Sequence, residues 1–323
     1  MGIERHGGSL MNAPALTPVR RDPDVDALVG PFFSYKLGQV LNLPDAASVH
    51  EQFVTAKPYP HIVLPNFFTP EIVECLRAET VDSQRLSQTF TDEFQDKKSI
   101  STGDALPPFI QALASKFASP AMLNYLEQVT GLRKLIPDPY YNTDYGYYHL
   151  TRPGGVLGSH VDHSHHDRLG TPHVLNLVVY LSPDWKHEDG GALGLFDESG
   201  KRVVKRVPCD FNTAILFSSS PIAYHGVDPV REGCGRERHS LYFAYYCIAE
   251  SEKATLQANF PSAFAVGSHE PTEVFHSTYF VVPFRKLFLP RNFRHLRARV
   301  RYFVKLFLPP IVTVLFSRLS RRS

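Results

Sequence analysis

The feature that most constrains the fold is a series of short apolar segments that starts near residue 145 and ends near residue 248. Each segment is bounded by Gly, Pro, Asp or Asn, the residues that favour turns. The segments lie at 145–150, 155–160, 174–181, 192–196, 203–207, 213–218 and 240–248. Many short strands at this spacing are typical of an antiparallel sandwich or barrel.

The residues before this series show a different pattern. Residues 58–65 form a short apolar run bounded by prolines, which predicts one strand. Thr69, Pro70 and Glu71 then resemble an N-cap, a first-turn proline and a first-turn acid, and further helices are expected at 107–117 and 121–130. This order predicts an α+β, mainly β protein, a jelly roll with N-terminal helices packed on its outside.

Composition sets the broad class. The chain has 323 residues, 43% hydrophobic and 20% charged, which is ordinary for a globular protein. The four cysteines form no CxxC pair, which favours free thiols in a reducing compartment, and the N-terminus lacks the apolar core of a secretory signal. We therefore expect a cytoplasmic protein with a disordered segment at 1–30, one barrel domain at 31–280 and an extension at 281–323.

The C-terminal extension differs from the rest of the chain in charge. Residues 281–323 contain eleven of the 34 basic residues and no acidic residue. Residues 1–280 therefore contain 23 basic and 32 acidic residues, which gives them a net negative charge. Within the extension, apolar residues fall on one helical face: Phe293, Leu296, Val300, Phe303 and Phe307. A basic amphipathic helix predicts peripheral contact with an anionic membrane surface. Packing on the barrel and contact with RNA phosphates are the alternatives, and nucleic acid is the less expected partner.

Three residues form a candidate metal site. His160 and Asp162 lie two positions apart at the end of a predicted strand, where side chains of the same parity share a face. His225 lies far downstream and is expected to come from a later strand. Two imidazoles and one carboxylate can hold Fe(II) on one face and leave the other positions open. The HxD pattern alone is weak, since a strand-end histidine and a hydrogen-bonded core histidine would fit equally well.

The segments around these residues make the pattern more specific. In order along the chain they are 153–162, 176–181 with Trp185, Gly190-Gly191-Ala192-Leu193, 212–217, 225–227 and Arg238-His239-Ser240-Leu241. This ordered series resembles the Fe(II)/2-oxoglutarate-dependent dioxygenases, in particular their prolyl-4-hydroxylase-like branch. The resemblance implies a double-stranded β-helix, also called a jelly roll.

The resemblance also implies a reaction and a site. Fe(II) would be held by His160, Asp162 and His225, and the cosubstrates would be 2-oxoglutarate and O₂, with release of succinate and CO₂. Halogenases of this superfamily lack the carboxylate ligand, so Asp162 favours hydroxylation of an unactivated C–H bond. Arg238 is expected to bind the distal carboxylate of 2-oxoglutarate, because a guanidinium can bind a carboxylate through two hydrogen bonds. Ser240 faces the same way on a strand and adds a further donor.

Several neighbouring residues are candidates for further roles. Tyr148 is the favoured cosubstrate-contacting tyrosine, with an aromatic core residue as the alternative. Arg236 competes with Arg238 for the carboxylate, Arg152 fits either an acidic substrate or a solvated loop, and Trp185 is expected to pack. A dense run beside the metal strand offers a rival ligand set, which we expect to be a loop at the pocket mouth: His163, His165, His166 and Asp167.

The main functional hypothesis is an Fe(II)- and 2-oxoglutarate-dependent hydroxylase, acting on a membrane-associated lipid or glycolipid if the extension binds membranes. The alternative enzyme hydroxylates prolyl or other protein side chains, or a free amino acid. A hypothesis of another class is a cupin-like metal-binding or interaction protein that has the barrel without turnover.

Overall fold

The computed structural model describes residues 34–78, 88–90, 95–101, 106–139, 147–166, 169–248, 263–265 and 274–276. The predicted disordered segment at 1–30 and the predicted amphipathic helix in 281–323 lie outside these residues. The division into a domain at 31–280 and two extensions therefore stays a prediction.

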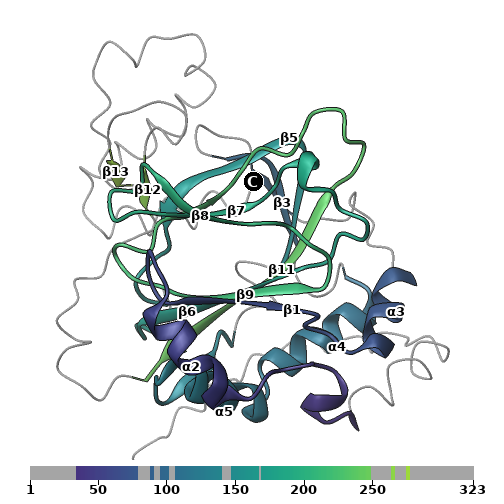
Figure 1. Ribbon diagram of the computed structural model, residues 1–323, viewed down its shortest axis with the longest axis vertical. Coiled ribbons are helices and arrows are strands. Elements are labelled where there is room, and N and C mark those ends of the chain that lie inside the picture. Colours follow the sequence, from purple (N-terminus) through teal and green to yellow (C-terminus); the bar gives the residue numbers. More distant parts are fainter. Residues whose placement is uncertain are drawn as a thin grey trace, which may run out of the picture.

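Most of the described chain forms one antiparallel sheet that curls into a nearly closed barrel (Figure 1). Its strands follow one another in the order β1 (His61–Pro65), β9 (Thr213–Ser218), β6 (His173–Tyr180), β11 (Arg238–Cys247), β5 (Tyr148–Val161), β10 (His225–Val227), β7 (Leu193–Phe196) and β8 (Val203–Val207). The 14-residue β5 belongs to both layers, because its first residues pair with β11 and its later residues with β10. The predicted jelly roll is confirmed.

Short strands extend the edges of this sheet. Two of them, β3 (Gln95–Ser101) and β12 (Ala263–Ala265), pair with successive parts of β5. The others are β2 (Gln88–Phe90), β4 (Leu135–Pro137) and β13 (Val274–His276), which pair with β3, β11 and β12 respectively. The edge of the strand that leads into the metal site is therefore paired along much of its length.

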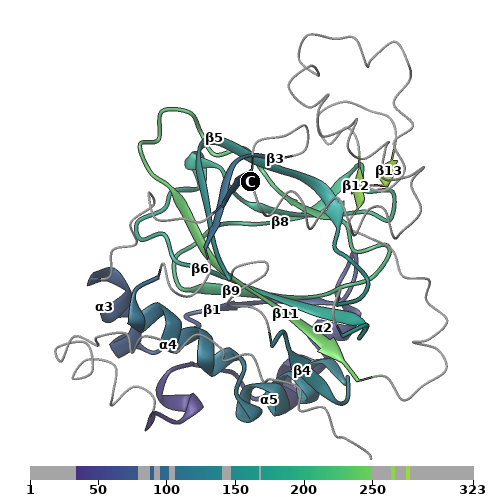
Figure 2. The ribbon, with the colours of Figure 1, turned by 180° about the vertical axis from the view of Figure 1, so that it is seen from behind.

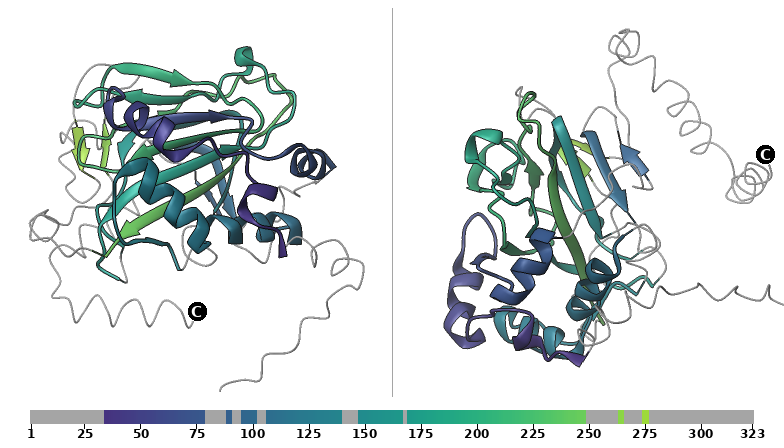
Figure 3. Two further views of the ribbon diagram at one scale, coloured as in Figure 1. Left: turned by 60° about the horizontal axis from the view of Figure 1, so that its bottom comes forward. Right: turned by 90° about the vertical axis from the view of Figure 1, so that its right-hand side faces the viewer.

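The helices gather on one side of the barrel, against the layer that contains β1, β9, β6 and β11 (Figures 2 and 3). They are α2 (Ala46–Thr55), α3 (Pro70–Ala78), α4 (Pro108–Phe117) and α5 (Pro120–Thr130), with single turns η1 (Leu37–Gln39) and η4 (His187–Asp189). The predicted helix starts near 70, 107 and 121 agree with α3, α4 and α5. None of the described helices is both long and apolar enough to cross a membrane.

Local capping explains the start of α2 and both ends of α5. The Asp45 carboxylate accepts from the Ser48 backbone N–H at 3.0 Å and starts α2, a helix that the strand-centred prediction missed. At α5, the Ser119 hydroxyl accepts from the Met122 N–H, and Gly131 ends the helix with a φ of 75°. Thr69 directly precedes α3, the position predicted for its N-cap, and the Thr69 hydroxyl donates to the Gln39 carbonyl.

Alternation along the strands separates two cores. The outer face of the helix-backed layer packs against the helices with a cluster that includes Leu177, Val179, Leu216, Leu241 and Phe243. The inner face forms a second cluster, which includes Val178, Tyr180, Leu195, Ile215 and Phe217. Because neighbouring strand residues point to opposite faces, every second residue of β11 turns into the barrel.

Candidate metal and cosubstrate site

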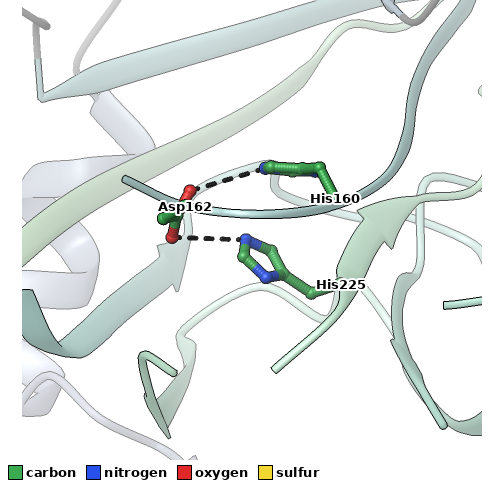
Figure 4. Close-up of side chains that lie close together, drawn as sticks. All are labelled: His160, Asp162 and His225. Carbon is green, nitrogen blue, oxygen red and sulfur yellow. Dashed lines mark ion pairs between the residues drawn. The ribbon is translucent and has the colours of Figure 1, made fainter. Parts of the chain in front are cut away.

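The metal site forms where β5 ends beside β10. His225 is the antiparallel partner of His160, and Asp162 follows the last residue of β5. The Nε2 atom of His160 lies 3.5 Å from Asp162 Oδ1, and the Nε2 atom of His225 lies 3.5 Å from Asp162 Oδ2. Figure 4 shows both imidazole rings turned toward the carboxylate. The structure therefore brings together the three residues that the sequence pattern singled out.

Backbone carbonyls orient both rings. The Nδ1–H of His160 donates to the Gly158 carbonyl at 2.9 Å, and that of His225 donates to the Ala223 carbonyl at 3.0 Å. A carbonyl can only accept, so the proton lies on Nδ1 in each ring. The lone pair on Nε2 is then available to a metal, which is the arrangement that outer hydrogen bonds give to metal-binding histidines.

The protonation states also suit a divalent cation. Burial alone would raise the pKa of Asp162, but His225 and His160 outweigh it and hold that pKa well below its usual range. Burial lowers the pKa of His225 to about 4, which Asp162 only partly offsets. A carboxylate and neutral imidazoles are the ligand forms that metals require. The ligand atoms all lie within 4.8 Å of one another, and this is the one such group in the described residues.

The neighbouring histidines do not form a rival site. His163 Nε2 lies 3.0 Å from the Tyr246 hydroxyl, and His166 Nε2 lies 3.0 Å from Asp138 Oδ1. His165 lies 2.9 Å from the Ser164 hydroxyl through Nδ1. Within the described residues these side chains join no metal-binding group, and Asp167 lies outside those residues. The contacts of His163 and His166 anchor the loop after the metal strand to the body of the protein.

Arg238 supplies a buried cation inside the barrel. Its side chain is only 3% exposed, its Nε–H donates to the Gly191 carbonyl at 2.8 Å, and its Nη1 donates to Ser240 Oγ at 3.3 Å. No described residue offers it a carboxylate. A buried guanidinium without a counter-charge is costly, so this position calls for an anionic ligand.

The Gly-Gly pair beside Arg238 has a steric reason. Gly191 has a φ of 69°, and a Cβ there would lie 2.9 Å from Arg238 Cδ. Gly190 has a φ of 77°, and a Cβ there would lie 2.1 Å from the Pro229 carbonyl oxygen. A side chain at either position would displace the backbone that holds the guanidinium.

Tyr180 is a candidate site residue that the sequence prediction missed. It lies opposite Ser240 in the pairing of β6 with β11, and the guanidinium carbon of Arg238 lies 5.1 Å from the centre of its ring. Its buried hydroxyl has no hydrogen-bond partner among the described residues. Burial raises the pKa of Tyr180 more than the Arg238 charge lowers it, so the hydroxyl keeps its proton. Arg238, Ser240 and Tyr180 thus form a donor set that fits the distal carboxylate of 2-oxoglutarate.

The structure corrects the position expected for Tyr148. Tyr148 lies opposite Leu241 on the helix-facing side of the sheet, and its hydroxyl lies 2.6 Å from His239 Nδ1. His149 instead lies opposite Ser240, and its ring stacks on Tyr242 at 5.1 Å with an interplanar angle of 16°. The aromatic residue beside the proposed cosubstrate pocket is therefore His149 and not Tyr148.

The competing residues have other partners. The Nη2 of Arg236 lies 2.6 Å from Asp189 Oδ2, and the Nη2 of Arg231 lies 2.6 Å from Asp189 Oδ1. Arg236 is thus engaged by Asp189, whereas Arg238 has no carboxylate partner among the described residues. Trp185 is buried and donates to the Gly190 carbonyl at 3.0 Å, so it packs as expected. Arg152 lies 3.4 Å from Glu237.

A jelly-roll barrel with two imidazoles, one carboxylate and a buried cation has the design of a metal-dependent oxygenase. Residues 145–246 match the sequence model of the 2OG-Fe(II) oxygenase superfamily, so the barrel of this chain contains a domain of that superfamily. The predicted resemblance is thereby confirmed, and so is the expected use of Fe(II), 2-oxoglutarate and O₂, which characterises this superfamily.

Curated relatives of the chain are prolyl hydroxylases. Prolyl 3-hydroxylase OGFOD1 of Mus musculus is 26% identical over 178 residues, which cover 54% of this chain and 30% of the mouse protein. The Xenopus laevis protein of the same name is 35% identical over 57 residues, or 16% of this chain and 11% of that protein. The matched part thus spans less than a third of the length of these relatives.

Solved structures of similar proteins include a Pseudomonas putida prolyl-4-hydroxylase, with 21% identity and a TM-score of 0.44, covering 63% of this chain and all of that one. Another is HygX from Streptomyces hygroscopicus with nickel and 2-oxoglutarate bound, with 16% identity and a TM-score of 0.38, covering 62% of this chain and 90% of that one.

Proposed function

We propose that His160, Asp162 and His225 hold Fe(II) and that Arg238, with Ser240 and Tyr180, binds the distal carboxylate of 2-oxoglutarate. The observation that carries the proposal is that one barrel holds both donor sets. His160 lies on β5, and Arg238 lies on the neighbouring strand β11, opposite Thr151 of β5. On this proposal the chain hydroxylates an unactivated C–H bond and releases succinate and CO₂.

Each residue has a defined task in this proposal. The two imidazoles donate Nε2 lone pairs, and the Asp162 carboxylate supplies the negative charge that a divalent cation needs. Arg238 neutralises the cosubstrate in a buried place, where a charge-assisted hydrogen bond is strong. Ser240 and Tyr180 each contribute one hydroxyl donor. Bound Fe(II) would supply the activation of O₂, which the protein side chains themselves do not provide.

The proposed substrate is a proline in a peptide or protein. Both curated relatives carry the name prolyl 3-hydroxylase, which supports this class. A membrane-associated lipid or glycolipid is the second candidate, because residues 281–323 contain eleven basic and no acidic residues. Free amino acids and other protein side chains are the remaining candidate substrates. A cytoplasmic location, with or without peripheral membrane contact, stays part of the proposal.

Succinate release with purified full-length protein tests the proposal. The protein is loaded with Fe(II), supplied with 2-oxoglutarate and O₂, and assayed with proline-containing peptides, free amino acids and lipid extracts. A gain of one oxygen on the peptide, matched by succinate, supports the prolyl class, and the same gain on a lipid supports the second candidate. No succinate with any substrate, and no uncoupled turnover, would favour the cupin-like binding protein without catalysis.

A further inference from the structure

A buried asparagine contacts the carboxylate of the candidate metal site. Asn176 lies on β6 with no solvent-exposed surface, and its Nδ2 donates to Asp162 Oδ2 at 2.8 Å. A buried amide is unfavourable unless its hydrogen bonds are made. Asp162 is one of the groups that satisfies it.

The other end of the amide is also satisfied. Asn176 Oδ1 accepts from the Tyr242 hydroxyl at 2.8 Å and lies 2.9 Å from His173 Nε2. Because an ionised carboxylate can only accept, the NH₂ group of Asn176 must face Asp162, and Oδ1 must then face Tyr242 and His173. The amide orientation follows from Asp162 and Tyr242, and the His173 ring lies against Oδ1.

Tyr242 and His173, which both contact Asn176 Oδ1, are themselves held in place. Tyr242 comes from β11 and stacks on His149. The buried ring of His173 packs against two rings, His163 and Tyr246, with ring centres 5.0 Å and 5.1 Å away. Rotation of the Asn176 side chain would break its hydrogen bonds to Asp162 and Tyr242 in a packed interior, where polar networks are most costly to leave half made.

We propose that Asn176 is a positioning residue for Asp162, with Tyr242 and His173 as its supports. It holds Oδ2 so that the carboxylate keeps one orientation toward the metal, and it does not contact the metal itself. The proposal rests on the proposed ligand set of His160, Asp162 and His225. Partners of this kind outside the ligand set commonly change metal affinity about 10- to 100-fold.

The arrangement also links the two halves of the site. β11 presents Arg238 and Ser240 to the proposed cosubstrate pocket, and two residues further along it presents Tyr242 to Asn176. A single strand thus sets the position of the cation and, through one amide, the position of the metal carboxylate.

A second buried asparagine provides a matched control. Asn212 is also buried, but its Oδ1 accepts from the Phe68 N–H at 2.7 Å and its Nδ2 donates to the Phe68 carbonyl at 3.2 Å. It joins β9 to the chain after β1 and has no contact with the metal site. Its replacement removes a buried amide of the same size without touching Asp162.

The test is Co(II) binding, because Co(II) occupies such sites without oxidation and its visible spectrum reports the ligand geometry. In the full chain, Asn176→Ala is expected to weaken Co(II) binding about 10- to 100-fold and to change the visible spectrum. Asn212→Ala is expected to lower the unfolding temperature and to leave the Co(II) affinity and spectrum as in the wild type. Tyr242→Phe keeps the stacked ring and removes one support, so a smaller loss of affinity is expected.

The possible outcomes separate this inference from the proposed ligand set. Wild-type affinity and spectrum in Asn176→Ala would overturn the positioning role, and so would equal losses in Asn176→Ala and Asn212→Ala. If Asn176→Ala does not fold, an unchanged affinity and spectrum in Tyr242→Phe would overturn it instead. A wild-type protein that binds no Co(II), or a His225→Ala variant that binds as well as the wild type, would instead reject the ligand set itself.

Discussion

The two faces of β11 differ in almost every physical property, although they alternate within ten residues. The outward face packs against the helices with Leu241, Phe243 and Tyr245. The inward face carries the polar residues Arg238, Ser240 and Tyr242. Stability is therefore expected to depend on the outward residues and ligand binding on the inward ones, because successive side chains of a strand serve separate surroundings.

The largest effect is expected on the inward face at Arg238. Arg238→Ala removes the counter-charge from a buried carboxylate, which costs about 3–5 kcal/mol, so half-maximal turnover should need about 100-fold or more 2-oxoglutarate. Steady-state assays with varied 2-oxoglutarate measure this. Arg236→Ala is the control, because its guanidinium already contacts Asp189. A larger shift in the control than in Arg238→Ala would show that the wrong cation was assigned.

On the outward face, Phe243→Ala should reduce stability with little effect on the site. Its ring lies 4.8 Å from the centre of Phe117 on α4 and is buried, so truncation to Ala is expected to cost about 3–5 kcal/mol. Urea unfolding measures the loss. The half-saturating 2-oxoglutarate concentration of the folded fraction should stay at the wild-type value. A shift as large as that of Arg238→Ala would contradict the expectation that ligand binding depends on the inward face alone.

A pH effect is expected from His239, which also lies on the outward face. Burial, and then the Arg238 charge, lower its pKa to about 4. In the unfolded chain, this histidine binds a proton near pH 6.5. Its contribution to the stability of the fold is therefore fully present above that pH and is lost as the pH falls from about 6.5 to about 4. Unfolding temperatures across this range should fall less steeply in His239→Gln than in the wild type. Parallel curves would exclude His239 as the source.

The basic extension at 281–323 is not part of β11, and its removal should have the smallest effect on the site. Deleting 290–323 should leave metal binding unchanged and reduce sedimentation with vesicles that contain phosphatidylserine, because the deleted residues are basic without acidic partners. Vesicles of neutral lipid serve as the control. Equal sedimentation of both proteins with anionic vesicles would remove the membrane hypothesis.

The sequence predicted most of the metal side of the site because that information is local. His160 and Asp162 share a face through their spacing, and turn residues marked the strands well enough to find the barrel. Arg238 and Arg236 both have the parity of Ser240, so spacing alone did not separate them. The salt bridge of Arg236 to Asp189 decides between them, and that contact spans residues that are not close in sequence.

The residues that the prediction missed lie where alternation gives no signal. Tyr180 and Asn176 belong to β6, which is buried on both faces and therefore shows a continuous apolar run. At Tyr148, three consecutive aromatic or histidine residues made the facing of the strand ambiguous, and a shift of one residue moves every side chain to the other face. Only the pairing of Ser240 with His149 settles it.

Metal binding by Asp162→Ala tests the central claim most directly. Titration of Co(II) into the wild type should give one site per chain, and Asp162→Ala should lose that site and all succinate release while it keeps a cooperative unfolding transition. The loss follows because Asp162 supplies the charge between the two imidazoles of the group. Wild-type metal affinity and turnover in Asp162→Ala would contradict the account.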